Sequence, residues 1–521
     1  MAQDKRETVS ELLGARTDTL DRVSESLRTD ARRVQDIQHL AQRAVAELQA
    51  SWSGPDLMHL SRQWEQQTSP QLDVASASLE TCAATLRAQS TAQRMASGDG
   101  VSGLSSAGLL LAAVVVGLST PHLSPPDRGS PQDNATWWSS LGPQQRQRVI
   151  TQHPDWIGNR DGVAFSSRDQ ANRALLSVRR ADLESERKRL EADLAGTFSG
   201  GLLTASDAAL KHVRDKLASI KVIEQTLARP GERQLVLLEM SQQRAQSAIA
   251  RGNLDTADHV AVFVPGLTTN VTDSLKEADA QMGRLQHRAE LESSRVTPLQ
   301  SAHTDRTATA SAATATNTTA TVTWIGYQVP QWKESFGLNS VAHDQAARNG
   351  AAQLVPFLQG ISSARPRDAH LTVLGHSYGS TTAGLALQQT TGVDDAVFFG
   401  SPGLHTDRLE DLRVPAGHTY YIEAPLDGAG DFGAFGIDPS HLAGIEHASA
   451  RESTVTDPMT GKTERYGGVM GHTSYLTDKS TSQYNMAVVV AGVPERRVHD
   501  RGVGAGDVLS WPLPGAGRTI R

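Results

Sequence analysis

Cysteine is almost absent from the sequence, and aromatic residues are scarce. The single cysteine, Cys82, excludes an intrachain disulfide framework and any metal site built from several thiolates. Aromatic residues make up 5% of the chain, which argues against stacking platforms for single-stranded nucleic acid or sugars. The net charge of −7 argues against a polybasic nucleic-acid binder, and the 38% hydrophobic content argues against a wholly disordered chain. A chain of 521 residues exceeds one ordinary core and is expected to fold as about two to four units.

The familiar cofactor motifs are also missing. The sequence contains no Walker phosphate loop, no dinucleotide glycine fingerprint and no HExxH zinc motif. We therefore expect neither an organic cofactor nor a metal ion. We expect no nucleic-acid partner either, because the chain is acidic overall.

One stretch, Val101 to Pro126, lacks charged residues, and it bears on membrane association. Its densest apolar part, Gly108 to Leu118, spans 11 residues, whereas crossing a bilayer takes roughly 18. Two interpretations of Val101 to Thr120 stay open: a buried or interfacial helix, which the short run favours, and a membrane-spanning helix. The first residues, MAQDKRETVSELLG, lack the apolar core of a signal peptide. Localisation stays open between the cytoplasm, export by another route and a membrane tether.

The first half of the chain has helical patterns. Between residues 8 and 97, apolar residues recur at three- and four-residue spacing, and Trp52-Ser53-Gly54-Pro55 interrupts them, which predicts a helical hairpin. The predicted organisation is a helical hairpin at 1–98, an apolar segment and linker at 99–135, a helical region packed on the following core at 136–232, an α/β catalytic domain at 233–495, and a flexible tail at 496–521.

From residue 233 onward, short β-branched or apolar runs alternate with helical stretches. This alternation predicts an α/β domain with a mainly parallel sheet, preceded by the all-α region. The predicted strands are 234–240, 259–264, 321–325, 370–374, 396–399 and 419–422, and the predicted helices are 273–291, 341–358 and 381–389.

The strongest chemical signal is the pentapeptide Gly375-His376-Ser377-Tyr378-Gly379. A predicted strand runs directly into it and a helix of small residues leaves it, which is the context of a nucleophile elbow. Glycines two residues on either side relieve the crowding around a serine held in a strained conformation. The pattern predicts that Ser377 is a nucleophile, and the alternative is a glycine-rich turn with an incidental serine.

A serine nucleophile needs a base and a carboxylate that orients it. In this arrangement the chain order is serine, acid, histidine. Counting strands beyond Ser377 favours Asp427 as the acid, with Asp431 as the alternative. His472, near the end of the domain, is the predicted base. We interpret the other candidate histidines as surface, capping or solvated groups: His441, His447 and His499.

The oxyanion formed during acyl transfer needs at least two preorganised donors. We expect the backbone N–H of Tyr378, directly after the serine, to be one of them. The turn Val264-Pro265-Gly266-Leu267 follows an earlier predicted strand, and Leu267 is the second candidate donor. The alternative for this turn is an ordinary strand-to-helix connection.

Together these motifs resemble, from about residue 136 to 492, a bacterial α/β-hydrolase subfamily formerly catalogued as a domain of unknown function. The resemblance is carried by Trp137-Trp138, Gly158-Asn159 with Asp161-Gly162, Arg168 with Asn172-Arg173, Val264-Pro265-Gly266, the pentapeptide around Ser377, Gly400-Ser401-Pro402-Gly403, Phe435-Gly436-Ile437-Asp438-Pro439 and His472-Thr473-Ser474-Tyr475. It implies an α/β-hydrolase fold and a serine hydrolase of esterase or lipase type, with Ser377, Asp427 and His472 as the triad. The implied substrate is a small acyl ester, cleaved through an acyl-enzyme. Relatives often have proline after the acid, and Gly428 stands here, which keeps Asp431 open.

The N-terminal hairpin is similar to WXG-type secretion proteins, with Trp52-Ser53-Gly54 at its turn. This resemblance implies a helical-hairpin partner protein that binds residues 1–98. It also implies a second function: a type VII secretion-associated interaction protein with the hydrolase domain as cargo or scaffold. The export signal Tyr-x-x-x-Asp/Glu is not evident, because no tyrosine precedes Tyr327. An ordinary helical hairpin is the alternative.

Overall fold

The structure is a computed structural model with two compact units, Met1–Leu118 and Ser119–Arg521. It describes residues 17–51, scattered positions between 61 and 91, and residues 123–196, 205–295, 318–330, 340–427, 435–457 and 459–500. The Trp52-Ser53-Gly54 turn, the segment Val101 to Thr120 and Asp431 lie outside these residues. Within the described ranges, no helix has both the length and the apolar character needed to cross a membrane.

The first unit is an antiparallel pair of helical segments, α2 (Thr17–Ser51) and the described positions between 61 and 91. Ser24 Oγ donates to the Ala83 carbonyl at 2.7 Å, and Gln38 Nε2 donates to Ser69 Oγ at 2.8 Å. The partner's number falls as the α2 number rises, so the two segments run in opposite directions. The predicted pair of N-terminal helices is therefore confirmed.

Among the described residues of this pair, the buried ones are small or polar. Residues seven apart lie on the same side of paired helices, so they form one seam. Apolar side chains that predicted the helix lie outside that seam, and Val23, Ile37 and Leu40 are 44%, 61% and 64% exposed. The buried seam residues are Ser24, Ala31 and Gln38 on α2 and Ser76, Ala83 and Ser90 opposite.

An eight-stranded sheet with the order β1-β2-β4-β3-β5-β6-β7-β8 forms the centre of the second unit. Strand β2 is antiparallel to β1 and β4, and the other neighbouring pairs are parallel. The strands are β1 (Arg233–Glu239), β2 (Gln246–Arg251), β3 (His259–Val264), β4 (Thr319–Ile325), β5 (His370–His376), β6 (Asp395–Phe399), β7 (Thr419–Glu423) and β8 (Glu446–Ser449). A separate hairpin pairs β9 (Ser453–Thr456) with β10 (Thr463–Tyr466). All six predicted strands are present, and β2 and β8 to β10 were not predicted.

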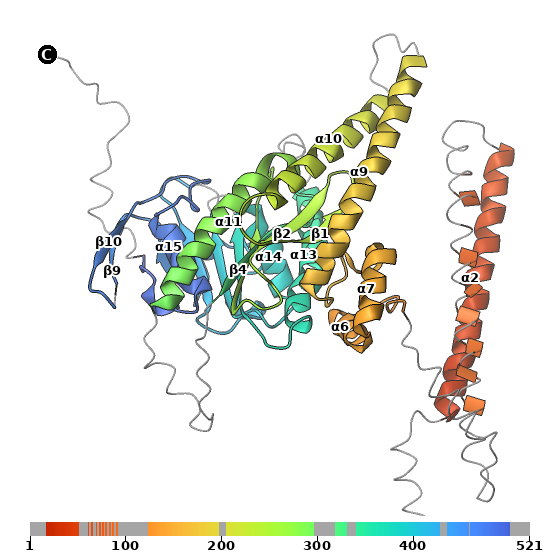
Figure 1. Ribbon diagram of the computed structural model, residues 1–521, viewed down its shortest axis with the longest axis horizontal. Helices are drawn as coiled ribbons and strands as arrows, with labels where there is room; N and C mark the ends of the chain where they lie inside the picture. Colours follow the sequence, from red (N-terminus) through yellow and green to blue (C-terminus); the bar gives the residue numbers. More distant parts are fainter. Residues whose placement is uncertain are drawn as a thin grey trace, which may run out of the picture. The chain divides into compact units, whose positions relative to one another are not determined.

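Helices cover both faces of the sheet, which confirms the predicted α/β-hydrolase fold class. The three helices predicted within this domain correspond to α11 (Val271–Ser294), α13 (Ser340–Ser363) and α14 (Tyr378–Leu387). Figure 1 shows α9 and α10 side by side as a long antiparallel pair that extends beyond the sheet. The remaining helices are α6 (Pro131–Ser140), α7 (Pro143–Gln152), α8 (Pro154–Ile157), α9 (Phe165–Gly196), α10 (Ala205–Leu227) and α15 (Thr481–Val490), with short 3-10 turns η3 (Leu409–Asp411), η5 (Pro439–His441) and η6 (Pro494–Arg496).

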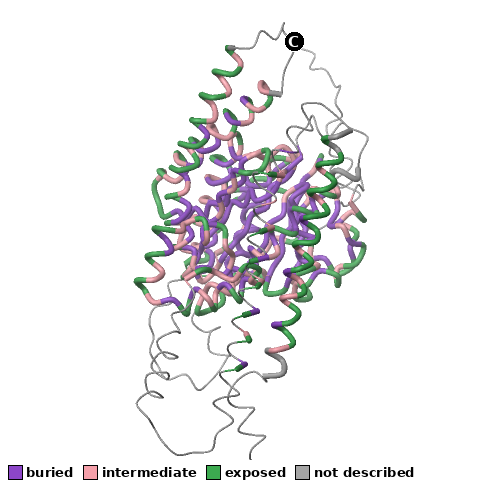
Figure 2. The backbone as a smooth tube through the Cα atoms, turned by 90° about the vertical axis from the view of Figure 1, so that its right-hand side faces the viewer, coloured by how far each residue is buried: buried purple, intermediate pink, exposed green. Residues whose placement is uncertain are grey.

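The core has two halves, one on each face of the sheet. Successive side chains of a strand point to opposite faces, so Val262 packs with α13 and α14 whereas Phe263 packs with α11 and α15. Both faces are buried, which explains why the parallel strands read as continuous apolar runs. In Figure 2 the buried segments of the second unit gather at its sheet, and exposed residues lie on the helices around it.

A buried arginine attaches the start of α9 to the sheet edge. Arg168 is fully buried, pairs with Asp161 at 2.8 Å and donates to the Val236 carbonyl of β1 at 2.6 Å. Its guanidinium also lies over the rings of Phe165 and Phe357, at 5.3 and 5.8 Å from their centroids. These contacts satisfy a charge that would be costly to bury alone.

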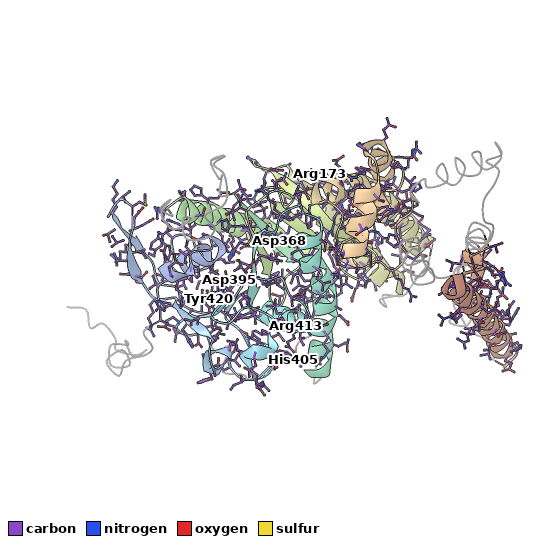
Figure 3. All side chains as sticks on the ribbon, turned by 90° about the horizontal axis from the view of Figure 1, so that it is seen from below. Arg173, Asp368, Asp395, His405, Arg413 and Tyr420 are labelled. Atoms are coloured by element: carbon purple, nitrogen blue, oxygen red, sulfur yellow. The ribbon has the colours of Figure 1, made fainter. Side chains whose placement is uncertain are left out.

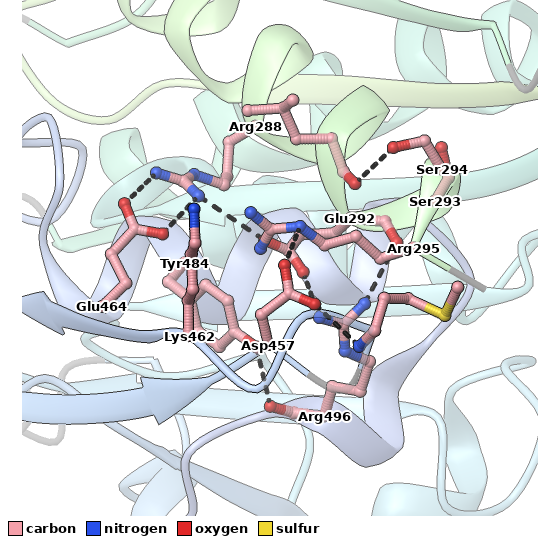
Figure 4. A network of polar contacts seen from close by, with 12 residues as sticks. Arg288, Glu292, Ser293, Ser294, Arg295, Asp457, Lys462, Glu464, Tyr484 and Arg496 are labelled. Atoms are coloured by element: carbon pink, nitrogen blue, oxygen red, sulfur yellow. Dashed lines mark hydrogen bonds and ion pairs between the residues drawn. The ribbon is translucent and has the colours of Figure 1, made fainter. Parts of the chain in front are cut away.

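A second polar network joins the end of α11 to the C-terminal part of the unit (Figure 4). The fully buried carboxylate of Glu292 contacts Arg288, Arg295 and Arg496, at 3.5, 2.8 and 2.6 Å. Arg288 also reaches Glu464 on β10 at 3.0 Å. A buried charge with several partners is costly to disrupt, so this network holds α11 against the β9–β10 hairpin and η6.

A third polar cluster lies at the N-terminal ends of the central strands. Figure 3 labels two residues there, Asp395 and Tyr420. The buried Asp395 carboxylate contacts His370 at 2.8 Å and His418 at 2.7 Å. Burial lowers the pKa of His370, but the hydrogen bond and the charge of Asp395 outweigh it and raise the pKa above its usual value. Burial and the charge of His370 lower the pKa of the neighbouring His259 to about 4.

Candidate active site

Ser377 occupies a sharp bend between β5 and α14. Its φ of 53° and ψ of −135° lie in a region that non-glycine residues rarely adopt, and α14 begins at the next residue. A Cβ at Gly379 would lie 2.1 Å from the Val264 carbonyl, and one at Gly375 would lie 2.8 Å from Ser380 Cα. Both glycines are therefore required by close backbone contacts, and the strand, bend and helix follow as expected.

The structure brings Ser377, His472 and Asp427 together in one chain of hydrogen bonds. Ser377 Oγ lies 2.7 Å from His472 Nε2, and His472 Nδ1 lies 2.9 Å from Asp427 Oδ1. A carboxylate only accepts, so Nδ1 carries the proton and Nε2 is left to accept the serine proton. Asp427 is buried, whereas the His472 side chain is 38% exposed. This geometry suits proton transfer from the serine hydroxyl to the imidazole.

The other candidate histidines lie away from Ser377. His441 is in η5 and its exposed ring lies 3.6 Å from Asp438. His447 is on β8, edge-on to the Tyr421 ring, and His499 pairs with the backbone of β8. The alternative acid, Asp431, lies outside the described residues.

Tyr475 is a buried partner of the carboxylate that the sequence reasoning did not assign. Its hydroxyl donates to Asp427 Oδ2 at 2.6 Å and accepts from the Ala424 amide at 2.9 Å. Burial and then the hydrogen bond to Asp427 raise the pKa of Tyr475 far above its usual value, so the phenol stays protonated and donates. Tyr475 lies in the His472-Thr473-Ser474-Tyr475 motif. Its place three residues after the predicted base was the feature of the sequence that could have indicated a role in the site.

His376, directly before the serine, holds the loop that carries His472. Its Nε2–H donates to the His472 carbonyl at 2.8 Å, and its ring stacks on Phe399 with 5.0 Å between centroids. Burial and the neighbouring His472 lower the pKa of His376 to about 4. The imidazole is therefore neutral near pH 7 and adds no positive charge beside His472.

Gly266 lies directly over the serine, at the turn that follows β3. A Cβ at Gly266 would lie 2.4 Å from Ser377 Cβ and 2.9 Å from Ser377 Oγ. The amide of Leu267 follows this glycine in the chain, and the amide of Tyr378 follows the serine. Each predicted oxyanion donor is therefore the chain neighbour of a residue at the serine, Leu267 of Gly266 and Tyr378 of Ser377 itself.

The segment after β4 holds the Gly266 turn in place. The Tyr327 hydroxyl donates to the Pro265 carbonyl at 3.0 Å, and the Thr268 amide donates to the Pro330 carbonyl at 2.9 Å. Thr268 has a φ of 66°, a second strained position beside the serine. The ring of Tyr327 is buried and stacks near that of Tyr378, 6.4 Å away, so it belongs to the core.

A cavity of about 500 Å³ opens beside Ser377. Such a volume is typical of sites for small organic ligands. Its lining includes Asp273 and Glu277 from α11, and no Lys or Arg is among the described residues that line it. The apolar lining side chains are Phe263, Leu267, Ala278, Phe399, Tyr475 and Leu476. The cavity therefore suits an uncharged, largely apolar group next to the serine.

In the described part of the chain, no group of three or more His, Cys, Asp or Glu residues is arranged to hold a metal ion.

A family model described as alpha/beta hydrolase matches residues 241–434. An uncharacterized protein of Mycobacterium tuberculosis is 32% identical over 258 residues, which cover 47% of this chain and 88% of that relative. A second uncharacterized protein of the same species is 29% identical over 318 residues, covering 59% of this chain and 44% of the relative.

Among solved structures, a cold-adapted esterase from an Arctic intertidal metagenomic library aligns with a TM-score of 0.28 and 12% identity, over 52% of this chain and 96% of the esterase. A Pyrobaculum calidifontis esterase aligns with a TM-score of 0.29 and 10% identity, over 59% of this chain and 97% of the esterase.

Gly266→Ala is expected to block access to the serine while leaving the protein folded. The added methyl would collide with Ser377, so we expect the rate of Ser377 phosphonylation by a fluorophosphonate to fall about 100-fold or more, a barrier increase of about 3 kcal/mol. The matched control is Gly467→Ala, where a Cβ would meet nothing closer than 4.0 Å. If both variants were labelled at equal rates and unfolded at the same temperature, the close contact between Gly266 and Ser377 would be contradicted.

Proposed function

This chain belongs to the alpha/beta hydrolase family, and we propose that it is a serine esterase that cleaves a carboxylic ester through an acyl-enzyme. The observation that carries the proposal is the hydrogen-bond chain from Ser377 through His472 to Asp427. Its serine sits in a strained bend beside a largely apolar cavity. This combination is typical of nucleophilic acyl transfer and has little use in a purely structural turn.

In the first half of the reaction, Ser377 Oγ bonds to the carbonyl carbon and His472 Nε2 takes the serine proton. The Nδ1–H bond to Asp427 keeps the imidazole in the required tautomer and stabilises its positive charge. When the carbon–oxygen bond to the alcohol breaks, His472 returns the proton to the leaving oxygen. Water then repeats the sequence on the acyl-enzyme and releases the acid.

The developing oxyanion is proposed to accept from the amides of Leu267 and Tyr378. Tyr378 is the first residue of α14, so the positive end of the helix dipole adds to the same stabilisation. The absence of a Cβ at Gly266 leaves the space beside Ser377 Oγ open. Donors that are fixed by a rigid turn and a helix start need little reorganisation as the charge forms.

The cavity indicates the class of ester. Apolar rings and aliphatic groups suit an uncharged acyl or alcohol part, and the carboxylates of Asp273 and Glu277 disfavour an anionic one. We therefore propose small uncharged esters as substrates.

Ser377→Ala is expected to abolish labelling by a fluorophosphonate probe and to lower kcat/KM for a p-nitrophenyl ester by about 10⁴-fold or more, because the nucleophile is removed. Gel fluorescence and ester hydrolysis measure the two effects. Ser474→Ala is the control, since this serine is half-buried, lies on the loop of His472, and its hydroxyl donates to the Met470 carbonyl. Labelling that persists in Ser377→Ala would refute the esterase proposal.

Tyr475→Phe is expected to lower kcat about tenfold with little change in KM. The variant loses a hydrogen bond to a buried carboxylate, worth about 1.5–3 kcal/mol, and leaves the Ala424 amide without its acceptor. With one donor fewer on Asp427, the imidazolium of His472 is favoured, so the acidic limb of the pH–activity profile should move to higher pH.

The control for this variant is Tyr484→Phe. Tyr484 lies in the same core half and is equally buried, but its hydroxyl bonds to the Arg496 carbonyl. A purely structural role for Tyr475 predicts similar pH profiles for both variants, and that result would exclude the positioning role.

We propose a second, compatible function for the first unit, binding of a helical protein partner. The observation that favours it is the set of apolar side chains on α2 that lie outside the buried seam. Val23, Ile37 and Leu40 are exposed, and 23 and 37 lie 14 residues apart on one side of the helix. Such a face is suited to packing against further helices.

Ile37→Ser combined with Leu40→Ser is expected to abolish co-purification of a small helical protein from the native host, because the apolar face is lost. Arg32→Gln, an exposed change on the same helix, should keep the partner. Mass spectrometry of the bound fraction and circular dichroism of each variant provide the measurements. Retention of the same partner by the double variant would exclude this face as the binding surface.

A further inference from the structure

A cavity of about 400 Å³ beside α11 is lined by four arginines and is separate from the lining of the cavity at Ser377. We call it the arginine pocket. Arg229 follows α10, Arg233 and Arg251 come from β1 and β2, and Arg284 comes from α11. The pocket thus draws its cations from four segments of the chain.

Three of these guanidinium groups share one carboxylate. Asp279 accepts two hydrogen bonds from Arg233, at 2.9 and 3.0 Å, one from Arg229 at 3.1 Å, and one from Arg251 at 3.4 Å. Three positive charges against one negative charge leave an excess of two. Arg284 is paired separately with Glu277 at 3.0 Å and does not change this balance.

The two remaining titratable residues that line the pocket are His287 and Asp478. If the Asp478 carboxylate is counted as one full negative charge, the excess falls from two positive charges to one. The pocket therefore remains cationic in a chain whose net charge is −7.

Arg251 is the least satisfied member of the group. Its bond to Asp279 is the longest of the four, and its buried Nε has no hydrogen-bond partner among the described residues. Burial lowers the pKa of Arg251; the charge of Asp279 opposes this, and the charges of Arg233 and Arg229 add to it. Its guanidinium therefore shares one carboxylate, Asp279, with Arg233 and Arg229, and makes the weakest contact of the three.

A glycine in α11 makes room for this guanidinium. A Cβ at Gly283 would lie 2.6 Å from Arg251 Cζ and 2.7 Å from its Nε. Glycine inside a helix costs about 1 kcal/mol relative to alanine. Gly283 therefore destabilises α11 slightly, at the position where the Arg251 guanidinium packs against the helix.

We propose that the arginine pocket binds a phosphate group, either as inorganic phosphate or as a small phosphomonoester. A phosphate carries between one and two negative charges near pH 7, which matches the excess in the pocket. The planar forks of Arg229 and Arg251 can each donate two hydrogen bonds to its oxygens. The bound group completes the charge balance around Asp279.

Isothermal titration of the full chain with inorganic phosphate, and in a second arm with glycerol 3-phosphate, tests the proposal. Sodium chloride keeps the ionic strength constant, because exposed charges respond to salt in general. We expect saturable binding of at least one probe and a rise in thermal unfolding temperature with its concentration. The arm that binds more tightly distinguishes the free ion from the monoester.

Arg251→Gln is expected to weaken that binding about tenfold or more, since a charged donor pair is lost. Arg229→Gln provides a second variant at a site that is 37% exposed, where folding is easily preserved. Arg408→Gln is the matched control, an exposed arginine that is paired with Glu410 away from the pocket. Binding that is equal in all three variants, or absent with both probes, would overturn the proposal.

Discussion

The structure around the candidate site depends on the close approach of several backbones to a serine held at positive φ. Each neighbouring segment has a glycine where it comes nearest to the site. Gly266 lies over Ser377, Gly379 packs under the carbonyls at the end of β3, and Gly400 leaves space beside Asp427 and His472. A Cβ at any of these three positions would lie within 3.0 Å of a neighbouring atom. Glycine at these three positions therefore allows Ser377, His472 and Asp427 to lie within hydrogen-bond distance of one another.

The parallel arrangement of the strands explains why these groups meet. The Gly266 turn follows β3, Ser377 follows β5 and Asp427 follows β7, and all three strands run in the same direction. Their carboxyl ends lie at one edge of the sheet, where α/β folds commonly place their ligands. The buried strands are rigid, so loops at that edge keep small functional groups in register.

Local patterns in the sequence predicted the parallel strands, the bend at Ser377 and the pairing of Asp427 with His472, because each depends on short motifs and on strand order. The contact of His376 with the His472 carbonyl spans 96 residues and that of Tyr475 with Asp427 spans 48, so the partners could not be read from local sequence; for Tyr475, its place three residues after His472 was a signal. The antiparallel β2 was missed because its sequence, QSAIAR, has a single β-branched residue, Ile249, and no aromatic residue. In the first unit, apolar periodicity predicted a helix correctly, but the buried seam residues that the structure describes are serine, alanine and glutamine, and Ile37 is exposed.

The buried Glu292 cluster sets a minimum length for the hydrolase unit. Arg496 lies beyond the last helix, yet it reaches back to a carboxylate at the end of α11, whose first turns line the cavity beside Ser377. A chain cut before this arginine would leave Glu292 with fewer counter-charges in a solvent-free position. Truncated versions for crystallisation or fusion should therefore retain the η6 turn, even though no residue there contacts the serine.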